Sequence, residues 1–423
     1  MPDRIRSIER DPGDEIRRGW PIMIVCFFGT LTSVVAMPFY IIGPITPSLQ
    51  SEFAWDRTSV VAATAFLQLG LVFGMPLSGR LIDRYGGRRV ALVSYLLTVS
   101  VFIALAIGLR SLPQIYAAYL VLGAGCAGAS TVPFTLLIGK WFAARRGVAL
   151  GIALAGTGLA SFIAPNLAQA VGSALGWRAV LLAVAAFLAL GIPVVLLGYR
   201  EPPVRRAASI PVADGAETPT ARTGLRQLMA DGRFVLLAVI LAMGGAFISS
   251  MVVHFVPMLV DAGVTPVRAA HIASLNGLAM ICGRLTIGWL LDRYPAVWLG
   301  TAMFLIAAGG CIIFVLGGPP VAPLMVIAMG FMIGAEIDLL SYLVLRYFRI
   351  TDYGLIYGYL YATYMIGATA SPWAMGYLIG RSGYDFMFMA AATMFAFIAL
   401  LFPILDRLKA GPVGRSSRPA TAA

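Results

Sequence analysis

The chain is poor in charge, and acidic residues are the scarcer kind. Only 12% of its 423 residues are charged and 60% are hydrophobic, whereas an ordinary soluble domain has about 25% charged and about 45–50% apolar residues. This composition excludes a soluble enzyme. The phosphate-binding pattern G-x-x-x-x-G-K-[ST] is also missing, which argues against ATP as an energy source within this chain.

Groupings of residues that would bind a metal or perform catalysis are also missing. The four cysteines, Cys26, Cys126, Cys282 and Cys311, show neither C-x-x-C nor Cys/His spacing, which argues against a disulfide framework and a metal site. The chain has only two histidines and no Ser/His/Asp grouping at readable spacing. We therefore expect no cofactor, no metal and no enzymatic activity, and interpret the cysteines as packing residues.

Long hydrophobic runs dominate what is present. Because a helix rises 1.5 Å per residue, ~20 apolar residues cross a ~30 Å hydrocarbon core. Twelve nearly charge-free runs are found, at about 20–46, 58–80, 88–109, 113–138, 146–172, 177–199, 232–260, 267–291, 297–317, 321–345, 353–380 and 384–406. The sequence thus predicts an all-α polytopic membrane protein with twelve transmembrane helices in two pseudo-symmetric six-helix bundles.

The basic residues predict the orientation in the membrane. With a cytoplasmic N-terminus, 25 of them lie on the cytoplasmic side and only Arg57, Arg110, Arg178, Arg268 and Arg381 lie outside, as the positive-inside rule requires. The net charge of +12 therefore marks topology and does not indicate a nucleic-acid partner. We expect a multi-pass protein of a bacterial-type inner membrane with both termini in the cytoplasm. No cleaved signal peptide is expected, because the first 19 residues have no apolar h-region.

Polar segments divide the chain into five parts. We predict a cytoplasmic N-terminal tail at 1–19, a six-helix bundle at 20–200, a cytoplasmic linker at 201–231, a second bundle at 232–406 and a disordered cytoplasmic tail at 407–423. We expect the protein to act as a monomer.

An internal repeat relates the two bundles. The stretch Gly74–Tyr85 can be laid over Gly283–Tyr294 with an offset of 209 residues, almost half the chain. Each stretch ends the second span of its half, which indicates two bundles related by parallel repetition.

The first of these stretches resembles a known loop signature. GRLIDRYGGRR, at Gly79–Arg89, is similar to the loop motif of the major facilitator superfamily, in which Asp83 sits where it can meet a helix N-terminus or a cation of the other half. The resemblance implies a cytoplasmic gate, for which the candidates are Gly79, Asp83, Arg84, Arg88, Arg89, Asp292 and Arg293. Anchoring of the helix ends in lipid headgroups is the alternative role for these charges.

Further segments are similar to one branch of that superfamily. WFAARRGVALGIALAGTGLA at Trp141–Ala160 and EFAWDR at Glu52–Arg57 resemble segments of bacterial members of the monocarboxylate transporter family. RLTIGWLLD, at Arg284–Asp292, resembles the eighth span of monocarboxylate and oxalate/formate transporters, where an arginine binds the substrate carboxylate. The resemblance implies that role for Arg284.

Three charges lie inside the predicted spans. Arg284 stands eight residues before Asp292, and Glu336 and Asp338 stand ten and eight before Arg346, so all three lie ~12 to ~15 Å from a helix end, in one layer. A charge at this depth costs at least ~2.5 kcal/mol and is expected to face a wet cavity or a partner. Arg284 suits a carboxylate because its guanidinium is a planar fork of donors; a permanent ion pair with Glu336 or Asp338 is the alternative.

The two acids are the candidates for proton coupling. Asp338 shares a helix face with Ser341, Tyr342 and Arg346, and Glu336 is rotated about 200° from it. Both cannot face one partner squarely, and the sequence leaves open which of them carries a proton and whether either is only structural.

Other polar side chains of the spans are candidate substrate contacts. Tyr357, Tyr361 and Tyr364 form a stripe on the eleventh span, either as a cavity wall or as packing between helices. Further candidates for the same cavity are Asn276, Tyr40, Gln68 and His254.

The sequence also departs from the resembled family. Met280 stands where mammalian-type carriers have an acid, and Lys140 and Lys409, the only lysines, lie outside the spans. A single cavity cation favours a monocarboxylate over a dicarboxylate. The sequence thus predicts a secondary transporter that moves a small organic anion by alternating access, with a proton as the coupling ion; the alternatives are proton-driven efflux of lipophilic compounds and a transport-dead sensor.

Overall fold

The computed structural model describes residues 12–202, 224–409 and 411, and the described residues are helical without a β-strand. Most of the expected linker and of the expected C-terminal tail lies outside the described residues. The N-terminal half contains α1 (Pro12–Leu31), α2 (Met37–Phe53), α3 (Arg57–Val61), α4 (Ala63–Tyr85), α5 (Gly87–Gly108), α6 (Leu112–Gly125), the 3₁₀ turn η1 (Ala127–Ala129), α7 (Val132–Trp141), α8 (Arg146–Ala189), α9 (Gly191–Pro193) and the π-turn η2 (Val194–Gly198).

The C-terminal half follows the linker and has fewer interruptions. It contains the short α11 (Leu225–Met229), which lies inside the expected linker, then α12 (Gly232–Asp261), α13 (Pro266–Leu291), α14 (Ala296–Gly317), the 3₁₀ turn η3 (Pro319–Val321), α15 (Ala322–Tyr347), the 3₁₀ turn η4 (Ile350–Asp352) and α16 (Tyr353–Arg407).

Two of these helices, α8 and α16, each run the length of their bundle twice. Eight helical segments of the described chain are long and apolar enough to span a membrane, and α8 and α16 turn back at Gly176 (φ 81°) and Gly383 (φ 77°). Another residue in this backbone conformation, with positive φ and ψ near 180°, would cost about 1–3 kcal/mol, so glycine makes the tight turn possible. The two turns lie 207 residues apart, close to the offset of the sequence repeat.

We call each helical run from one end of a bundle to the other a passage. Two other passages are interrupted at points where the hydropathy of the sequence had predicted continuous apolar runs. The first passage breaks between α1 and α2, and the fourth between α6 and α7, and the two breaks meet because the Val34 amide donates to the Ala129 carbonyl at 3.0 Å. Backbone groups freed by a break inside a membrane need partners within the protein, and the paired breaks supply them. With these two, the described residues make twelve passages, as predicted.

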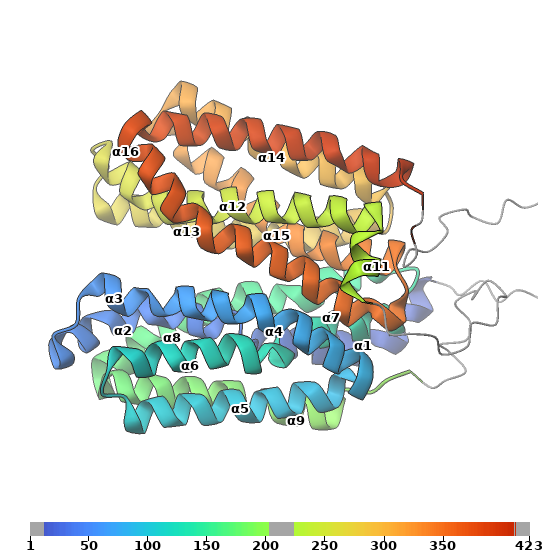
Figure 1. Cartoon of the computed structure of the whole chain (residues 1–423), viewed down its shortest axis with the longest axis horizontal. Helices are drawn as coiled ribbons and strands as arrows, with labels where there is room; N and C mark the ends of the chain where they lie inside the picture. Colours follow the sequence, from blue (N-terminus) through green and yellow to red (C-terminus); the bar gives the residue numbers. More distant parts are fainter. Residues whose placement is uncertain (1–11, 203–223, 410, 412–423) are drawn as a thin grey trace, which may run out of the picture.

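The passages form two bundles that lie side by side (Figure 1). Between the bundles α4 packs against α16 and α8 packs against α13, so the second passage of each half contacts the fifth passage of the other. This is the arrangement that a parallel repeat produces. We call the end where α1 begins and α16 ends, at the right in Figure 1, the linker end; the other end is the opposite end.

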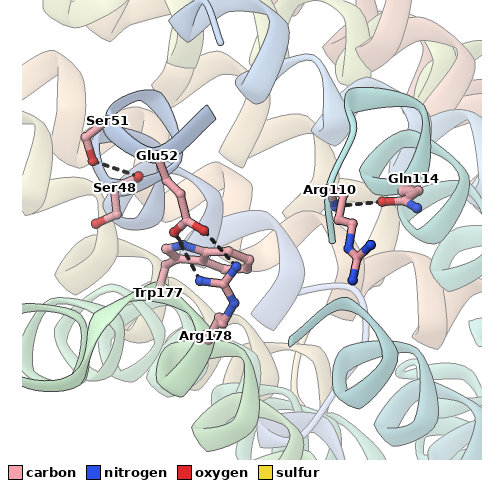
Figure 2. A network of polar contacts seen from close by, with 7 residues as sticks. All are labelled: Ser48, Ser51, Glu52, Arg110, Gln114, Trp177 and Arg178. Carbon is pink, nitrogen blue, oxygen red and sulfur yellow. Dashed lines mark hydrogen bonds and ion pairs between the residues drawn. The ribbon is translucent and has the colours of Figure 1, made fainter. Parts of the chain in front are cut away.

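Polar side chains tie the N-terminal bundle together at its opposite end. Glu52 at the end of α2 accepts hydrogen bonds from Arg178 Nη2 (2.7 Å) and Trp177 Nε1 (2.6 Å), just after the turn at Gly176. Nearby in Figure 2, the Gln114 side chain caps the start of α6 by accepting from the Arg110 amide (2.7 Å). These contacts fix where α2, α6 and the second half of α8 begin or end.

Candidate functional site

The site is built around an ion pair buried inside the C-terminal bundle. Arg284 Nη1 on α13 donates to Asp338 Oδ1 on α15 at 2.6 Å, and the two side chains are 5% and 0% exposed. The helices approach closely here because Gly283 lies against the backbone of Phe331. The local sequence therefore sets the guanidinium beside this carboxylate.

Each member of the ion pair has one polar atom that forms no hydrogen bond in the described structure. Arg284 Nε and Asp338 Oδ2 are buried and have no hydrogen-bond partner within the described structure. A buried donor without a partner costs about 1–3 kcal/mol. One nitrogen of the guanidinium is thus paired with Asp338, while another makes no hydrogen bond in the described structure.

A row of tyrosines on α16 lies next to the pair. Ring centroids follow one another at 5.6, 6.1 and 5.9 Å along Tyr353, Tyr357, Tyr361 and Tyr364. Tyr357 and Tyr361 interact electrostatically with Arg284, and so does Tyr40 of the N-terminal bundle. Phenolic groups from both bundles therefore lie within electrostatic range of one guanidinium.

The hydroxyl groups of this row also connect the bundles. Tyr353 Oη donates to Thr135 Oγ1 on α7 at 2.8 Å, and Tyr357 Oη lies 3.4 Å from Thr131 Oγ1. Neither threonine nor Tyr353 was selected from the sequence, although Tyr353 continues the i, i+4 spacing of the stripe by one turn. The threonines carry no sequence signal of their own, because their role depends on the packing of α7 against α16.

Glu336 does not share the partner of Asp338. It is buried, its Oε1 has no hydrogen-bond partner in the described residues, and this oxygen lies close to Gly244 of α12. The rotation between the two acids places them in different surroundings on one helix.

Three of the predicted substrate contacts have other neighbours in the structure. Asn276 lines a separate cavity in the C-terminal bundle. Gln68 Oε1 accepts from the Thr369 hydroxyl at 3.2 Å, which makes it a contact between α4 and α16. His254 Nε2 lies 2.9 Å from the carbonyl oxygen of Pro372 and connects α12 to α16.

At the linker end, two acids cap helices of the opposite bundle. Asp83 accepts from the Gly354 and Leu355 amides at 3.0 and 2.8 Å, at the start of α16. Asp292 accepts from the Gly147 and Val148 amides at 2.6 and 3.0 Å, at the start of α8. A carboxylate satisfies free N–H groups and the positive end of the helix dipole, so we call these two contacts the paired latches.

Glycines allow the latches to form. A Cβ atom at Gly79 would overlap the backbone of Gly354, and one at Gly147 would overlap the backbone of Gly288. Because no side chain intervenes, the helices of the two bundles touch at the linker end. Burial raises the pKa of Asp292, which lies just beyond the end of α13.

Three of the arginines predicted for the gate contact groups of their own bundle. Arg84 lies over the Tyr85 ring (4.9 Å) and Arg293 over the Trp289 ring (3.7 Å), so each stacks on its own helix end. Arg88 donates to the Leu196 carbonyl within the N-terminal bundle at 2.6 Å, and Arg89 is exposed. A different arginine, Arg80, reaches the other bundle, where its Nη2 donates to the Tyr359 hydroxyl at 2.5 Å.

Comparison with known proteins identifies this architecture. A sequence profile described as Major Facilitator Superfamily matches residues 28–348. The chain belongs to the major facilitator superfamily. It is therefore a multi-pass membrane transporter and not an enzyme.

Similar proteins narrow the relationship. The transporter is 25% identical over 447 residues to monocarboxylate transporter 12 of Xenopus laevis, covering 97% of this chain and 94% of that protein. It is 28% identical over 304 residues to monocarboxylate transporter 12-B of Danio rerio, covering 65% of this chain and spanning 62% of that relative's length.

Solved structures share the fold of the transporter. The human organic anion transporter MFSD10 (TETRAN) aligns with a TM-score of 0.73 at 16% identity over 90% of this chain and 99% of that one. The proton:xylose symporter XylE aligns with a TM-score of 0.72 at 14% identity over 91% and 95%. At these identities the likeness shows the fold alone.

Proposed function

We propose that the transporter moves a small organic anion, a monocarboxylate, by alternating access and in symport with a proton. The observation that carries this proposal is the buried Nε of Arg284, which has no acceptor in the described structure although Nη1 of the same guanidinium is paired with Asp338. A substrate carboxylate supplies the missing acceptor and removes the cost of the unpaired donor.

The surroundings of the guanidinium suit one carboxylate. Asp338 already compensates the charge of Arg284, so a second carboxylate on the substrate would find no second cation. Tyr40, Tyr357 and Tyr361 provide hydroxyl donors and aromatic surface for the remainder of a small anion. The names of the relatives, monocarboxylate transporters 12 and 12-B, support the same substrate class.

The paired latches provide the conformational part of the cycle. In this structure the bundles are held together at the linker end by Asp83 and Asp292. Release of both latches would let the bundles separate there and expose the site to that side. We propose that the linker end and both termini lie in the cytoplasm of a cell with a bacterial-type inner membrane, and that the monomer is the transporting unit.

Uptake into proteoliposomes tests the substrate assignment. The purified full chain would be assayed with labelled pyruvate, acetate and benzoate under an inward proton gradient. Arg284→Gln removes a charge-assisted hydrogen bond worth about 2 kcal/mol, so saturable uptake should fall about thirtyfold or more.

Two further variants make the result interpretable. Arg284→Gln combined with Asp338→Asn leaves no unpaired charge, so it should fold and still not transport. Arg268→Ala changes an exposed arginine near the start of the same helix and should leave uptake unchanged. Saturable uptake at the original rate in the double variant would remove Arg284 from the substrate site.

A further inference from the structure

Glu336 and Asp338, the two acids inside the predicted spans, differ in which group balances their charge. Asp338 is held by the guanidinium of Arg284 at 2.6 Å. Glu336 is only 4% exposed, and its Oε1 has no hydrogen-bond partner in the described residues. An unpaired carboxylate in such a place is costly enough that the group takes up a proton instead.

The groups that face Glu336 give it no positive charge. Tyr361 and Tyr364 of α16 lie within electrostatic range of Glu336, and both are neutral hydroxyl groups. From α12 it approaches Gly244, and Arg284 of α13 is bound to Asp338. Within the described chain, no ion pair joins Glu336 to a basic side chain, and its Oε1 accepts no hydrogen bond.

A cavity begins about one helical turn from Glu336, at Ile333 of α15, on the side of the opposite end. It has a volume of about 110 Å³, and its lining includes Met251, Phe255, Asn276, Met329 and Ile333. A space of this size is large enough to admit water, and the buried Asn276 Oδ1, which has no partner in the described structure, would accept a hydrogen bond from a water there.

The cavity and Glu336 share the same helix faces. Ile333 precedes Glu336 by three residues on α15, and Met251 follows Gly244 by seven on α12, which are helical repeats of one face. Phe255 lies near the end of α12 at Asp261. The cavity thus runs from close to Glu336 toward the opposite end, apart from the Arg284 pair.

We propose that Glu336 is the proton-binding group of the transporter, reached from the opposite end through this cavity, and that Asp338 is the fixed counter-ion of Arg284. The inference rests on the proposed proton-coupled anion transport. Binding converts the Glu336 carboxylate and one proton from water to a neutral carboxylic acid. The neutral acid removes a negative charge from the neighbourhood of the incoming anion and so favours its binding to Arg284.

Infrared spectroscopy tests the protonation without a substrate. The purified protein at neutral pH should show the carbonyl stretch of a protonated carboxylic acid, which shifts in D₂O. Glu336→Gln should remove this band, and the matched variant Asp338→Asn should retain it. Glu336→Gln should also keep the melting temperature, whereas Asp338→Asn should lower it by leaving Arg284 unpaired.

Transport assays separate the proton step from anion binding. With pyruvate as the probe, Glu336→Gln should keep exchange of internal for external label while its net uptake falls about tenfold or more and loses its dependence on outside pH between about pH 6 and about pH 8. Ala273→Leu, which narrows the cavity, should slow net uptake and leave exchange unchanged.

The outcomes distinguish the two proposals. The assignment of Glu336 is overturned if the band survives Glu336→Gln, or if Asp338→Asn is the variant that loses it. An unchanged net uptake in Ala273→Leu overturns the cavity as the route. If the wild type moves none of the three carboxylates, the proposed substrate class fails, while the infrared result still decides whether Glu336 binds the proton.

Discussion

At the residue scale, the neighbours of a side chain decide its chemistry more than its type does. Glu336 and Asp338 are both carboxylates, lie two residues apart on α15 and are both buried. Only Asp338 meets a guanidinium. One carboxylate is thereby fixed as a counter-ion, and the other is left to respond to protons.

The Tyr357 hydroxyl offers a test of the aromatic wall. It lies 3.4 Å from the Thr131 hydroxyl and within electrostatic range of the Arg284 guanidinium, so Tyr357→Phe removes one hydrogen-bonding group worth about 1 kcal/mol. We expect the KM for the transported carboxylate to rise about fivefold with little change in kcat. Labelled uptake at varied concentration measures both constants.

Tyr384→Phe is the matched control for this change. Tyr384 donates to Asp261 near the opposite end, away from the guanidinium, so its loss should leave the KM unchanged. An unaltered KM in Tyr357→Phe would mean that this ring only packs between helices.

At the scale of elements, contacts between helix ends hold the N-terminal bundle in shape. Hydrogen bonds from Arg178 and Trp177 to Glu52 lower the pKa of this carboxyl below its ordinary value of 4.5. The folded state therefore binds this proton less readily than the unfolded chain does. The resulting stabilisation is present above the ordinary pKa and is lost as the pH falls through the lowered one.

Glu52→Gln should therefore lower the melting temperature at neutral pH and have no effect at a pH below the lowered pKa, where the wild-type carboxyl is itself protonated. Thermal unfolding of the two proteins over a pH series measures this difference. Asp385→Asn, at an exposed position in the other bundle, serves as the control and should show no such difference. A stability difference that is independent of pH would show that packing, not the charge of Glu52, is responsible.

Most elements were predictable from hydropathy, but their interruptions were not. Twelve passages follow from the lengths of the apolar runs, since each run matches the thickness of a bilayer. The breaks at Thr32–Ala36 and at Cys126–Thr131 leave no mark on a hydropathy profile, because each break is stabilised by the other through Val34 and Ala129. A local sequence cannot reveal a partner that lies about a hundred residues away.

At the scale of the whole molecule, the paired latches obey the internal repeat. Asp83 and Asp292 are 209 residues apart, and the amides that they bind, at Gly354 and Gly147, are 207 apart. Each half caps a helix of the other, so the closed linker end is nearly symmetric. Loss of both caps should open this end more than loss of either one.

Distance measurements between spin labels test the latches. Labels at Tyr85 and Tyr294, which are exposed at equivalent positions of the two halves, would be attached after replacement of Cys282 by Ser. We expect the double change Asp83→Ala/Asp292→Ala to shift the population toward longer distances, with each single change giving a smaller shift.

Asp261→Ala removes an acid at the opposite end, where it binds Tyr384, and should leave the distances unaltered. A double variant with the same distance distribution as the original protein would show that helix packing alone keeps the linker end closed.

The sequence by itself determined that this protein spans a membrane, that it consists of two related halves and that Arg284, Glu336 and Asp338 lie at similar depth. These features depend on the polarity and spacing of residues along single helices, which a sequence records directly. Only the tertiary structure decided that Asp338 pairs with Arg284, that Glu336 has no such partner and that Tyr353 and Thr135 join the bundles. Such choices depend on how each helix is rotated and which helix packs against it, and these are properties of contacts between distant segments.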